Sequence, residues 1–369
     1  MGIIDYMEVP KRGFNIFLDK DSHLLVVFYE WKKNTDIRDY KVIKVVDWTP
    51  DANELHLIKE DWDIIEQYVR RGQAHLLSER HTKYLSACTK GVGHGKDFRE
   101  QPFSLEPAKQ RALSFKPSFV SMIFNTRDDV GKVLADQPES ILSRNLYDGE
   151  KFESYILGLY KEYIGHSCSE IEKQLNIDLS ASKQYHHDLA LSMAKLTHAK
   201  QPKEFTQAGI IIKTVRVRKD GWKPKESMSF PFIRYDDIIK EDWENSTFYS
   251  QLDHRFFTPV FGYTDVPSKQ TSKDLVFKGA FFWSISDEDL PVIKSVWEET
   301  KALVDADVFQ HFARKSDNRI VHIRPHARKK SDMADYKGEK RVKLSFWLND
   351  TFIQGIVGQN LSSDHQDTL

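Results

Sequence analysis

The sequence contains an internal repeat, and no other feature limits the possible fold as much. The stretch LIKEDWDIIEQYV at Leu57–Val69 resembles VIKSVWEETKALV at Val292–Val304, because both contain Ile-Lys, two further residues, Trp and an acidic residue. Each stretch has apolar residues at helical spacing and predicts an amphipathic helix. The faces expected to be buried comprise Ile58, Trp62, Ile65 and Val69 in the first helix and Ile293, Trp297, Thr300 and Val304 in the second.

Four further pairs of segments recur in the same order in both halves of the chain. The pairs are residues 3–9 with 232–238, 23–31 with 275–285, 82–90 with 318–326, and 109–119 with 340–352. The last pair is matched on a shared Leu-Ser-Phe stretch that follows basic residues and precedes a phenylalanine. The common order predicts a duplicated α/β domain, with two tandem copies.

The two copies differ at their beginnings. The second copy contains the apolar stretch QAGIIIKTVRV at Gln207–Val217 before its match to the segment that begins at Ile3, and the first copy has no counterpart. We therefore expect an incomplete first copy, whose sheet lacks a strand and whose stability is low. The segment that links the two copies also has apolar residues at helical spacing, and Ser167 or Ser169 is a candidate N-cap there. The expected domains are 1–145 (truncated first copy), 146–200 (helical start of the second copy), 201–358 (remainder of the second copy) and 359–369 (polar tail).

Basic residues are concentrated in two blocks at equivalent places in the repeat. Residues 80–116 contain eight Lys or Arg against three Asp or Glu, and residues 311–343 contain eleven against four, although the net charge of the chain is −1. Two basic blocks in an otherwise acidic chain indicate a polyanionic partner touched at two places. The alternative is that both blocks are solvated loops that happen to be basic.

The remaining composition excludes several classes of protein. A hydrophobic share of 40% and an aromatic share of 12% are sufficient for folded cores. The sequence has no apolar run long enough to cross a membrane and no secretory leader pattern, which favours a cytoplasmic protein without membrane contact. Cys88 and Cys168 are too few for a disulfide framework or a cysteine zinc site, and we expect no bound metal.

Taken together, these segments resemble the Sau-type, GATC-specific type II restriction endonucleases, which are similar to the mismatch-repair nuclease MutH. The resemblance covers nearly the whole chain and is carried by the lysine-containing strand, the two Ile-Lys-x-x-Trp helices, YLSACTKG at 84–91, AKQRALSFKPSF at 108–119, HIRPH at 322–326 and SFWLND at 345–350. It implies two restriction-endonuclease-like cores, each a mixed sheet flanked by helices. It also implies double-stranded DNA as the partner, with a second DNA site or a homodimer as further possibilities.

The resemblance implies Mg²⁺-dependent hydrolysis of a phosphodiester by the complete family enzyme. In that family the first copy carries an Asp followed by Glu-x-Lys on a strand, because Mg²⁺ prefers oxygen ligands and activates water. The lysine lies on the same strand face as the second acid, since side chains alternate. This chain lacks that segment in its first copy, so we expect no intact catalytic residues.

The second copy retains part of the pattern in the stretch KEFTQAGIIIK. Lys213 matches the lysine, Glu204 falls where the first carboxylate is expected, and Ile211 replaces the second carboxylate. Isoleucine cannot bind a metal ion, so the sequence predicts a degenerate pseudo-active site. The alternative is that Lys213 is only a lysine at the edge of a strand.

The resemblance and the basic blocks also predict the residues that contact DNA. Tyr84 falls where MutH-like proteins place a tyrosine near the adenine whose methylation is sensed, and Ile320 replaces it in the second copy. Lys and Arg contacts to phosphates give affinity, and bidentate Arg contacts identify guanine. The candidates are Tyr84, Lys90, Arg99, Lys109 and Arg111 in the first copy and Arg324, His326, Arg328, Lys329, Lys340 and Lys343 in the second.

Two alternatives to a restriction enzyme remain open on the sequence. One is a DNA-binding effector subunit or remnant without nuclease activity. The other is an unrelated protein–protein scaffold, for which the two basic blocks would be coincidental.

Overall fold

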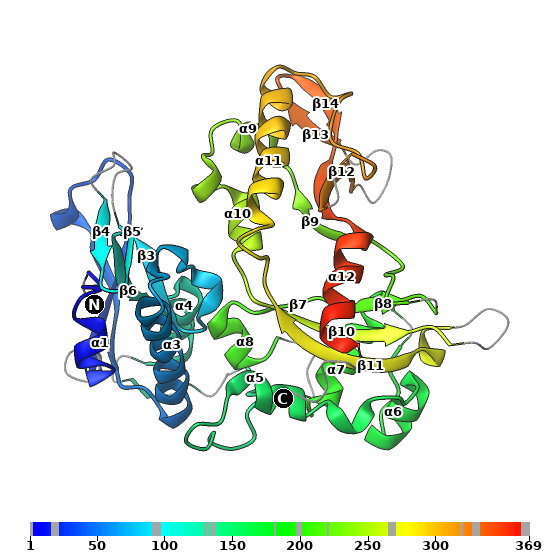
Figure 1. Cartoon of the computed structure of the whole chain (residues 1–369), viewed down its shortest axis with the longest axis horizontal. Helices are drawn as coiled ribbons and strands as arrows, with labels where there is room; N and C mark the ends of the chain where they lie inside the picture. Colours follow the sequence, from blue (N-terminus) through cyan, green and yellow to red (C-terminus); the bar gives the residue numbers. More distant parts are fainter. Residues whose placement is uncertain are drawn as a thin grey trace. The chain divides into compact units, whose positions relative to one another are not determined.

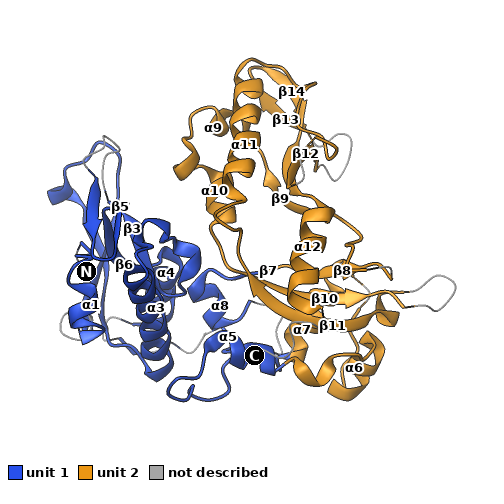
Figure 2. Cartoon of the chain, viewed as in Figure 1, with its two compact units in different colours: residues 1–159, 194–211 blue, residues 160–193, 212–369 orange. Residues whose placement is uncertain are grey.

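The chain folds into two compact units of mixed α/β structure (Figure 1, Figure 2). The computed structural model describes residues 3–15, 22–90, 97–128, 131–132, 134, 138–180, 182–196, 201–219, 221–264, 271–317, 320–326 and 333–362. Unit 1 comprises Met1–Leu159 and Ala194–Ile211, and unit 2 comprises Tyr160–Met193 and Ile212–Leu369. The segment 146–200 is therefore divided between the units, whereas the sequence predicted that it would begin the second copy as a whole. No helix within the described ranges is both long enough and apolar enough to span a bilayer.

Unit 1 contains three two-stranded antiparallel pairs and a central long helix. The pairs are β1 (Leu24–Glu30) with β2 (Lys41–Trp48), β3 (Leu85–Thr89) with β6 (Arg111–Phe115), and β4 (Phe98–Gln101) with β5 (Ser104–Lys109). The helices are α1 (Val9–Arg12), α3 (Ala52–Arg70), α4 (Pro117–Thr126), α5 (Phe152–Gly158) and α8 (Lys203–Ala208), with 3-10 turns η1 (Ile37–Asp39), η2 (Ala74–Leu76) and η3 (Glu79–His81).

Unit 2 is built around a sheet in which β10 (Phe256–Gly262) pairs with three other strands. It pairs antiparallel with β11 (Val276–Trp283) and parallel with β8 (Val215–Val217), and also pairs with β7 (Ile211–Ile212). A second sheet has the order β12 (Val321–Pro325), β15 (Leu344–Leu348), β9 (Met228–Phe232), and β13 (Met333–Tyr336) pairs with β14 (Glu339–Val342). The helices are η4 (Lys161–Tyr163), α6 (Cys168–Leu175), α7 (Tyr185–Met193), α9 (Tyr235–Ile238), η5 (Trp243–Asn245), α10 (Thr247–Leu252), η6 (Ser272–Asp274), α11 (Leu290–Asp305) and α12 (Asp350–Leu361).

The two helices predicted from the repeat are confirmed. They are α3 in unit 1 and α11 in unit 2, and every residue of the two predicted faces is buried. Asp51 caps α3 in a reciprocal box with Glu54. The candidate cap Ser167 is also confirmed, because it forms a capping box with Glu170 at the start of α6.

The two units contain the same succession of elements. Unit 1 has the order β1, β2, α3, β3, β4, β5, β6, α4, and unit 2 has β10, β11, α11, β12, β13, β14, β15, α12, with the same antiparallel partners in each (Figure 1). Each unit also has one equivalent backbone hydrogen bond. The amide of Ile4 donates to the carbonyl of Arg111 at 2.8 Å, and the amide of Ile233 donates to the carbonyl of Leu344 at 2.7 Å.

Two details of the sequence match are wrong. Residues 23–31 were matched to 275–285, but β1 is the first strand of its hairpin and β11 is the second strand of the corresponding one, so β1 corresponds to β10. The Leu-Ser-Phe match is wrong by two residues. The recurring hydrogen bonds place Arg111 opposite Leu344 in the repeat, and the residues before the following helices, Lys116 and Asn349, have the same offset. Local similarity could not determine register, which depends on cross-strand pairing.

The hairpins β1–β2 and β10–β11, with which the two series of elements begin, differ in their exposure to solvent. In unit 1 the side chains of Leu25, Val27 and Tyr29 on β1 are 68%, 46% and 52% exposed. In unit 2 every residue of β10 is buried, with α7 packed against β10 and α12 against β11 (Figure 1). Among the described residues, the β1–β2 hairpin of unit 1 is therefore less covered than the β10–β11 hairpin of unit 2.

Two buried tyrosine hydroxyls stabilise equivalent places in the units. Tyr6 donates to the carbonyl of Lys109 at 2.6 Å, and Tyr235 donates to the carbonyl of Val342. Burial raises the pKa of each tyrosine to about 12, so both hydroxyls remain donors at neutral pH. We expect Tyr6→Phe and Tyr235→Phe each to lower the free energy of unfolding by about 1 kcal/mol.

Chemical unfolding followed by circular dichroism would measure both changes. Tyr147→Phe is a suitable control because the Tyr147 side chain is 66% exposed. If the two buried variants unfolded at the same denaturant concentration as this control, the hydrogen bonds would contribute nothing to stability.

Candidate degenerate nuclease pocket and basic surface

The predicted lysine-containing strand is shorter than the sequence suggested. Gly209 ends α8 in a left-handed conformation with φ of 66°, which explains the glycine before the strand. The extended backbone is then divided into β7 and β8, with Lys213 between them. The Lys213 amide donates to the carbonyl of Phe257 on β10 at 2.9 Å, so Lys213 is attached to the central sheet of unit 2.

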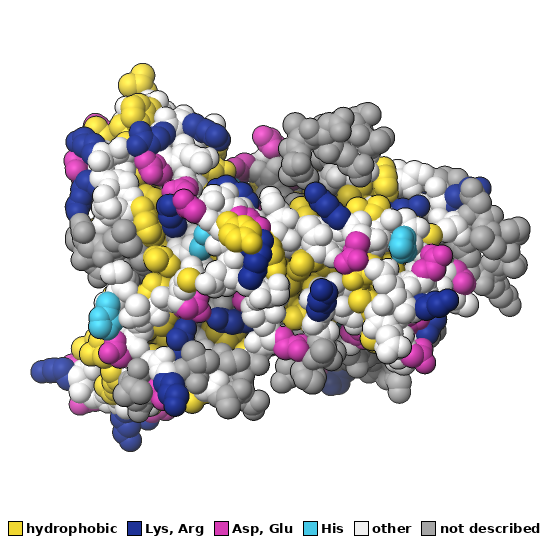
Figure 3. Space-filling view, turned by 90° about the horizontal axis from the view of Figure 1, so that it is seen from below, with side chains coloured by type: hydrophobic (Ala, Val, Ile, Leu, Met, Phe, Trp, Pro, Cys, Tyr) yellow, Lys and Arg dark blue, Asp and Glu magenta, His cyan; other side chains and the backbone are white. Residues whose placement is uncertain are grey.

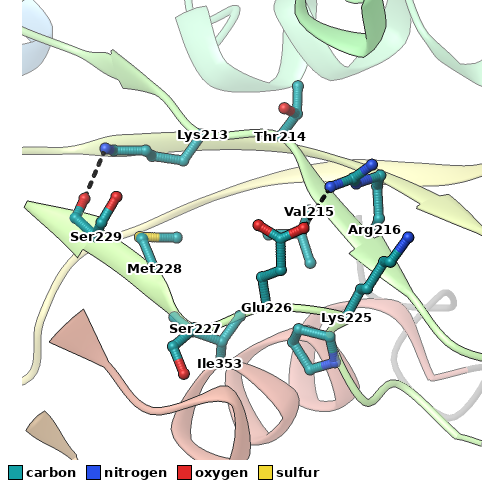
Figure 4. Close-up of a pocket in the computed structure, with 11 residues that line it drawn as sticks. Lys213, Thr214, Val215, Arg216, Lys225, Glu226, Ser227, Met228, Ser229 and Ile353 are labelled. Carbon is teal, nitrogen blue, oxygen red and sulfur yellow. Dashed lines mark hydrogen bonds and ion pairs between the residues drawn. The ribbon is translucent and has the colours of Figure 1, made fainter. Parts of the chain in front are cut away.

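Lys213 lines a cavity of about 190 Å³ (Figure 4). Its Nζ donates to the carbonyl of Ser229 at 3.3 Å and lies 5.7 Å from the centroid of the Phe230 ring. Burial lowers its pKa, and within the described ranges no carboxylate lies at ion-pair distance from its ammonium group. Lys213 therefore carries a charge that is partly removed from water, and the described residues supply no carboxylate as its counter-ion.

The two other residues of the predicted pseudo-active site belong to unit 1, whereas Lys213 belongs to unit 2. Glu204 lies on the helix α8 of unit 1, not on a strand, and is only 3% exposed. Its carboxylate accepts from the Ser140 hydroxyl at 2.6 Å and from the Ile141 amide at 2.9 Å, while burial raises its pKa. Ile211 is at the end of unit 1 and begins β7. Glu204 thus holds a loop of unit 1.

The residues of this cavity do not fit Mg²⁺. The lining carboxylate, Glu226, forms an ion pair with Arg216 at 2.7 Å, and Lys213 and Lys225 also line the cavity. Nearby cations repel a metal ion, and one carboxylate supplies too few oxygen ligands. Across the described ranges, no group of three His, Cys, Asp or Glu side chains could hold a metal ion.

The described basic candidates of unit 2 lie on β12 and β14 or directly after these strands. Arg324 is exposed, and its guanidinium lies 3.7 Å from the centroid of the Trp347 ring on the adjacent strand. His326 Nδ1 forms a hydrogen bond with Ser345 Oγ at 3.0 Å, and the His326 ring also packs against Trp347. Lys343 lies over the ring of Phe232. Aromatic faces thus lie against Arg324 and Lys343 and can orient both cations.

The next candidate, Lys340, is less available. It forms an ion pair with Asp335 at 2.7 Å. Lys340 and Arg324 border a cavity of about 480 Å³ that Arg314 and Arg341 also line. Arg341 pairs with Asp307 and Glu339. The predicted contacts Arg328 and Lys329 lie outside the described residues.

The basic candidates of unit 1 divide into exposed and buried residues. Lys90 and Arg99 are exposed, and Lys109 is half-buried. Arg111 is 8% exposed, and its guanidinium donates to the carbonyl of Ala87 at 2.7 Å. Lys90 and Arg99 can therefore meet a phosphate, whereas Arg111 joins β6 to β3.

Tyr84 does not lie where a DNA base could reach it in this conformation. It is 1% exposed, stacks on Phe119 with ring centroids 4.6 Å apart, and donates from its hydroxyl to Gln207 Oε1 at 2.9 Å. Burial raises its pKa well above the usual value. The residue matched to Tyr84 in the second half is Ile320, which is apolar and also buried. A buried Tyr84 agrees with this match.

Sequence reasoning missed four residues of these sites. Arg216, Lys225 and Glu226 line the Lys213 cavity, and Trp347 supports Arg324. No motif identifies the first three, because they meet only when the segment after β8 folds back. Trp347 had a usable indication, since an aromatic residue directly follows the Leu-Ser-Phe stretch of the second half. Charges elsewhere are mixed, as Lys, Arg, Asp and Glu are interspersed on the face shown in Figure 3.

Comparisons with known proteins identify the family. The model of the DNA mismatch repair enzyme MutH matches residues 194–295, which include Lys213. The DNA mismatch repair protein MutH of Vibrio vulnificus strain YJ016 is 24% identical over 57% of this chain and 95% of its own length. The type II restriction enzyme Sau3AI of Staphylococcus aureus is 30% identical over 96% of this chain and 81% of its own length. The chain belongs to the Sau3AI-like, MutH-related family of type II restriction enzymes.

Proposed function

We propose that this chain binds double-stranded DNA at GATC-type sites through two tandem MutH-like copies, and that it does not hydrolyse DNA by itself. The observation that carries DNA binding is the group of basic residues on and directly after β12 and β14, with Arg324 held on the face of Trp347 from β15. A guanidinium fixed in this way can form bidentate contacts with guanine or phosphate. Family membership supports DNA as the polyanion that this surface meets.

The repeated order of elements supports the tandem arrangement. Eight elements recur in the two units with the same antiparallel pairs, and the hydrogen bonds of Ile4 and Ile233 are equivalent. The unit 1 copy would include residues 1–145, and the rest of the second copy residues 212–358 in place of the predicted 201–358, because Ala194–Ile211 belong to unit 1. In the complete family enzyme, Mg²⁺ held by acidic residues would activate water and stabilise the charge on the transferred phosphate.

The lack of catalysis is supported by the side chains at the matching places. Lys213 has no carboxylate partner within the described ranges, and Glu204 is engaged by Ser140 and Ile141. The chain would then act as a DNA-binding effector, with a second DNA site or a homodimer as its mode of assembly. A catalytic segment carrying the carboxylates would restore a site-specific deoxyribonuclease.

The first test is binding to a short duplex that contains GATC, measured by fluorescence anisotropy at several salt concentrations. We expect the affinity to fall at least about tenfold between roughly 100 and 300 mM salt, because each neutralised phosphate releases counterions. A duplex with the four bases permuted should bind more weakly. Absence of binding at low salt would contradict DNA binding, and equal affinity for both duplexes would contradict GATC recognition.

The second test is cleavage of the same duplex by the purified chain in the presence of Mg²⁺. We expect the duplex to remain intact under conditions in which a complete GATC-specific enzyme cuts it. Specific cleavage by the chain alone would show that the carboxylates are supplied in a way that the described residues do not reveal.

A double variant would locate the interface. Arg324→Ala combined with Lys343→Ala should reduce the steepness of the salt dependence by about two phosphate contacts. Lys294→Ala is the matched control, because Lys294 is on α11 and pairs with Glu298. An unchanged salt dependence in the double variant would place the interface elsewhere.

A further inference from the structure

The β1–β2 hairpin of unit 1 presents an apolar face to solvent. Leu25, Val27 and Tyr29 lie on the same side of β1, because alternate residues of a strand share a face, and all three are exposed. Val42 on β2 is paired with Tyr29 and is 59% exposed. These four residues form the outer face of the hairpin. Contiguous exposed apolar patches are typical of interaction sites.

The inner face of the same hairpin is covered by a helix. Phe28 on the inner side of β1 packs against Phe124 of α4, with ring centroids 5.0 Å apart. On the outer face, Tyr29 stacks on Tyr40 with centroids 5.3 Å apart and still remains half exposed. Within the described part of unit 1, the two faces of this small sheet therefore differ in their cover.

The β10–β11 hairpin of unit 2 corresponds to this hairpin residue by residue. Trp48 on β2 and Trp283 on β11 precede the tryptophans of α3 and α11 by the same number of residues. Each of the two is paired with the first residue of its partner strand, β1 or β10. The register shifts of the two hairpins lie directly before Tyr29 and directly before Phe261. Tyr29 therefore occupies the position of Phe261.

The face of β10 that corresponds to the outer face is buried under a helical segment of unit 2. The counterpart of Leu25 is Phe257, whose ring packs against Tyr160 with centroids 5.2 Å apart. Phe261 packs against His186 of α7, with centroids 4.8 Å apart (Figure 1). Both phenylalanines are buried. Unit 2 thus shows what kind of segment this face of the hairpin accepts.

We propose that the outer face of the β1–β2 hairpin binds an amphipathic helix of a partner polypeptide, with aromatic and aliphatic side chains on the contacting side. Tyr160–Met193 is a segment of this chemistry in unit 2. Leu25 is smaller than phenylalanine, so a ring of the partner has space to pack on it. Tyr29 supplies an aromatic ring for an edge-to-face or stacked contact. Burial of the four apolar side chains drives the association.

The probe is a fluorescein-labelled synthetic peptide of residues 160–193, added to the full chain and followed by fluorescence anisotropy. We expect a Kd of about 10 to 100 µM, since an isolated helical segment is largely unfolded in water and folds only on binding. Leu25→Glu should weaken binding at least about tenfold, because it buries a carboxylate without a partner under the helix. Leu105→Glu introduces the same charge at a fully exposed leucine of β5 and should bind as the original chain does.

A second variant and an altered peptide make the result independent of the folding of one protein. Val42→Glu changes the other strand of the outer face and should weaken binding to a similar extent. In the peptide, Tyr160→Ala together with His186→Ala should lower the affinity severalfold, because these two rings make the corresponding contacts in unit 2.

The outcomes separate the possible occupants of this face. No binding at about 1 mM peptide overturns the helix as the occupant. Equal binding by Leu25→Glu and the original chain overturns the site. Sedimentation velocity of the chain alone tests a second copy, and a dimer that Leu25→Glu dissociates would assign the face to self-association and overturn the helix. Helix binding here goes beyond the proposed DNA-binding function, and no DNA is present in the test, so a failure of DNA binding leaves this result unaffected.

Discussion

Asp61→Ala is expected to lower the free energy of unfolding of unit 1 by about 4 kcal/mol. Asp61 is on α3 and has no exposed surface. Its carboxylate accepts from three consecutive backbone amides, those of Lys83 at 2.7 Å, Tyr84 at 2.6 Å and Leu85 at 2.9 Å. Alanine would leave all three donors buried without an acceptor, and it would also remove a charge that lies 3.9 Å from the Lys83 ammonium.

Two matched variants sharpen this test, which is read by chemical unfolding. Asp61→Asn retains one oxygen for the amides of Tyr84 and Leu85 but places an amino group against the amide of Lys83, so we expect an intermediate loss. Asp63→Ala, on the same helix, should change stability by no more than about 0.5 kcal/mol. A loss below about 1 kcal/mol in Asp61→Ala would show that water replaces the carboxylate. On α11, Val296 precedes Trp297 as Asp61 precedes Trp62 on α3, so the two helices are joined to the next strand differently.

Lowering the pH from 7 to 4 is expected to destabilise unit 2 by about 3 kcal/mol through His186 alone. His186 lies on α7, is 6% exposed and packs against Phe261 with ring centroids 4.8 Å apart. Burial, and secondarily the charge of Arg216, lower its pKa from 6.5 to about 4. The folded protein therefore resists protonation that the unfolded chain accepts.

The sign follows from the depressed pKa of the folded state. Above pH 6.5 both states are neutral at this histidine, and the stability is fully present. As the pH falls from 6.5 towards 4, only the unfolded state gains the proton, so stability is lost across this window. Below about pH 4 both states are protonated and this contribution no longer changes.

The measurement is the difference between the original protein and His186→Phe in chemical unfolding at pH 7 and pH 4. The difference isolates His186 from other groups, including His322, whose pKa burial also lowers. His311→Phe replaces an exposed histidine of unit 2 and should retain the full pH dependence. Equal pH dependence of His186→Phe and the original protein would mean that this histidine is hydrated in solution.

The repeat shows how much of the fold can be predicted from local sequence patterns. The apolar spacing around Trp62 and Trp297 was sufficient to predict α3 and α11 and their buried faces. Helical residues three and four apart share a face, so this information is contained in a few consecutive turns. The Ser167 cap was predictable for the same reason, because the capping contact reaches only to Glu170.

Register and strand assignment could not be obtained in the same way. The Leu-Ser-Phe match was displaced by two residues, and β1 was matched with β11, although its counterpart is β10. A strand has the same alternation at every even shift, so sequence similarity leaves register undetermined until the partner strand is known. The buried place of Tyr84 likewise follows from packing against Phe119 and Gln207.

By itself, the sequence determined the recurring order of α and β segments, the two amphipathic helices and the basic blocks. Only the tertiary structure decided that Glu204 holds a loop of unit 1, and that Lys213, Arg216, Lys225 and Glu226 line one cavity. The physical reason is the distance along the chain over which each effect acts. Periodicity and composition act within a few residues, whereas the charge balance of a site depends on side chains that strand pairing and chain reversal bring together.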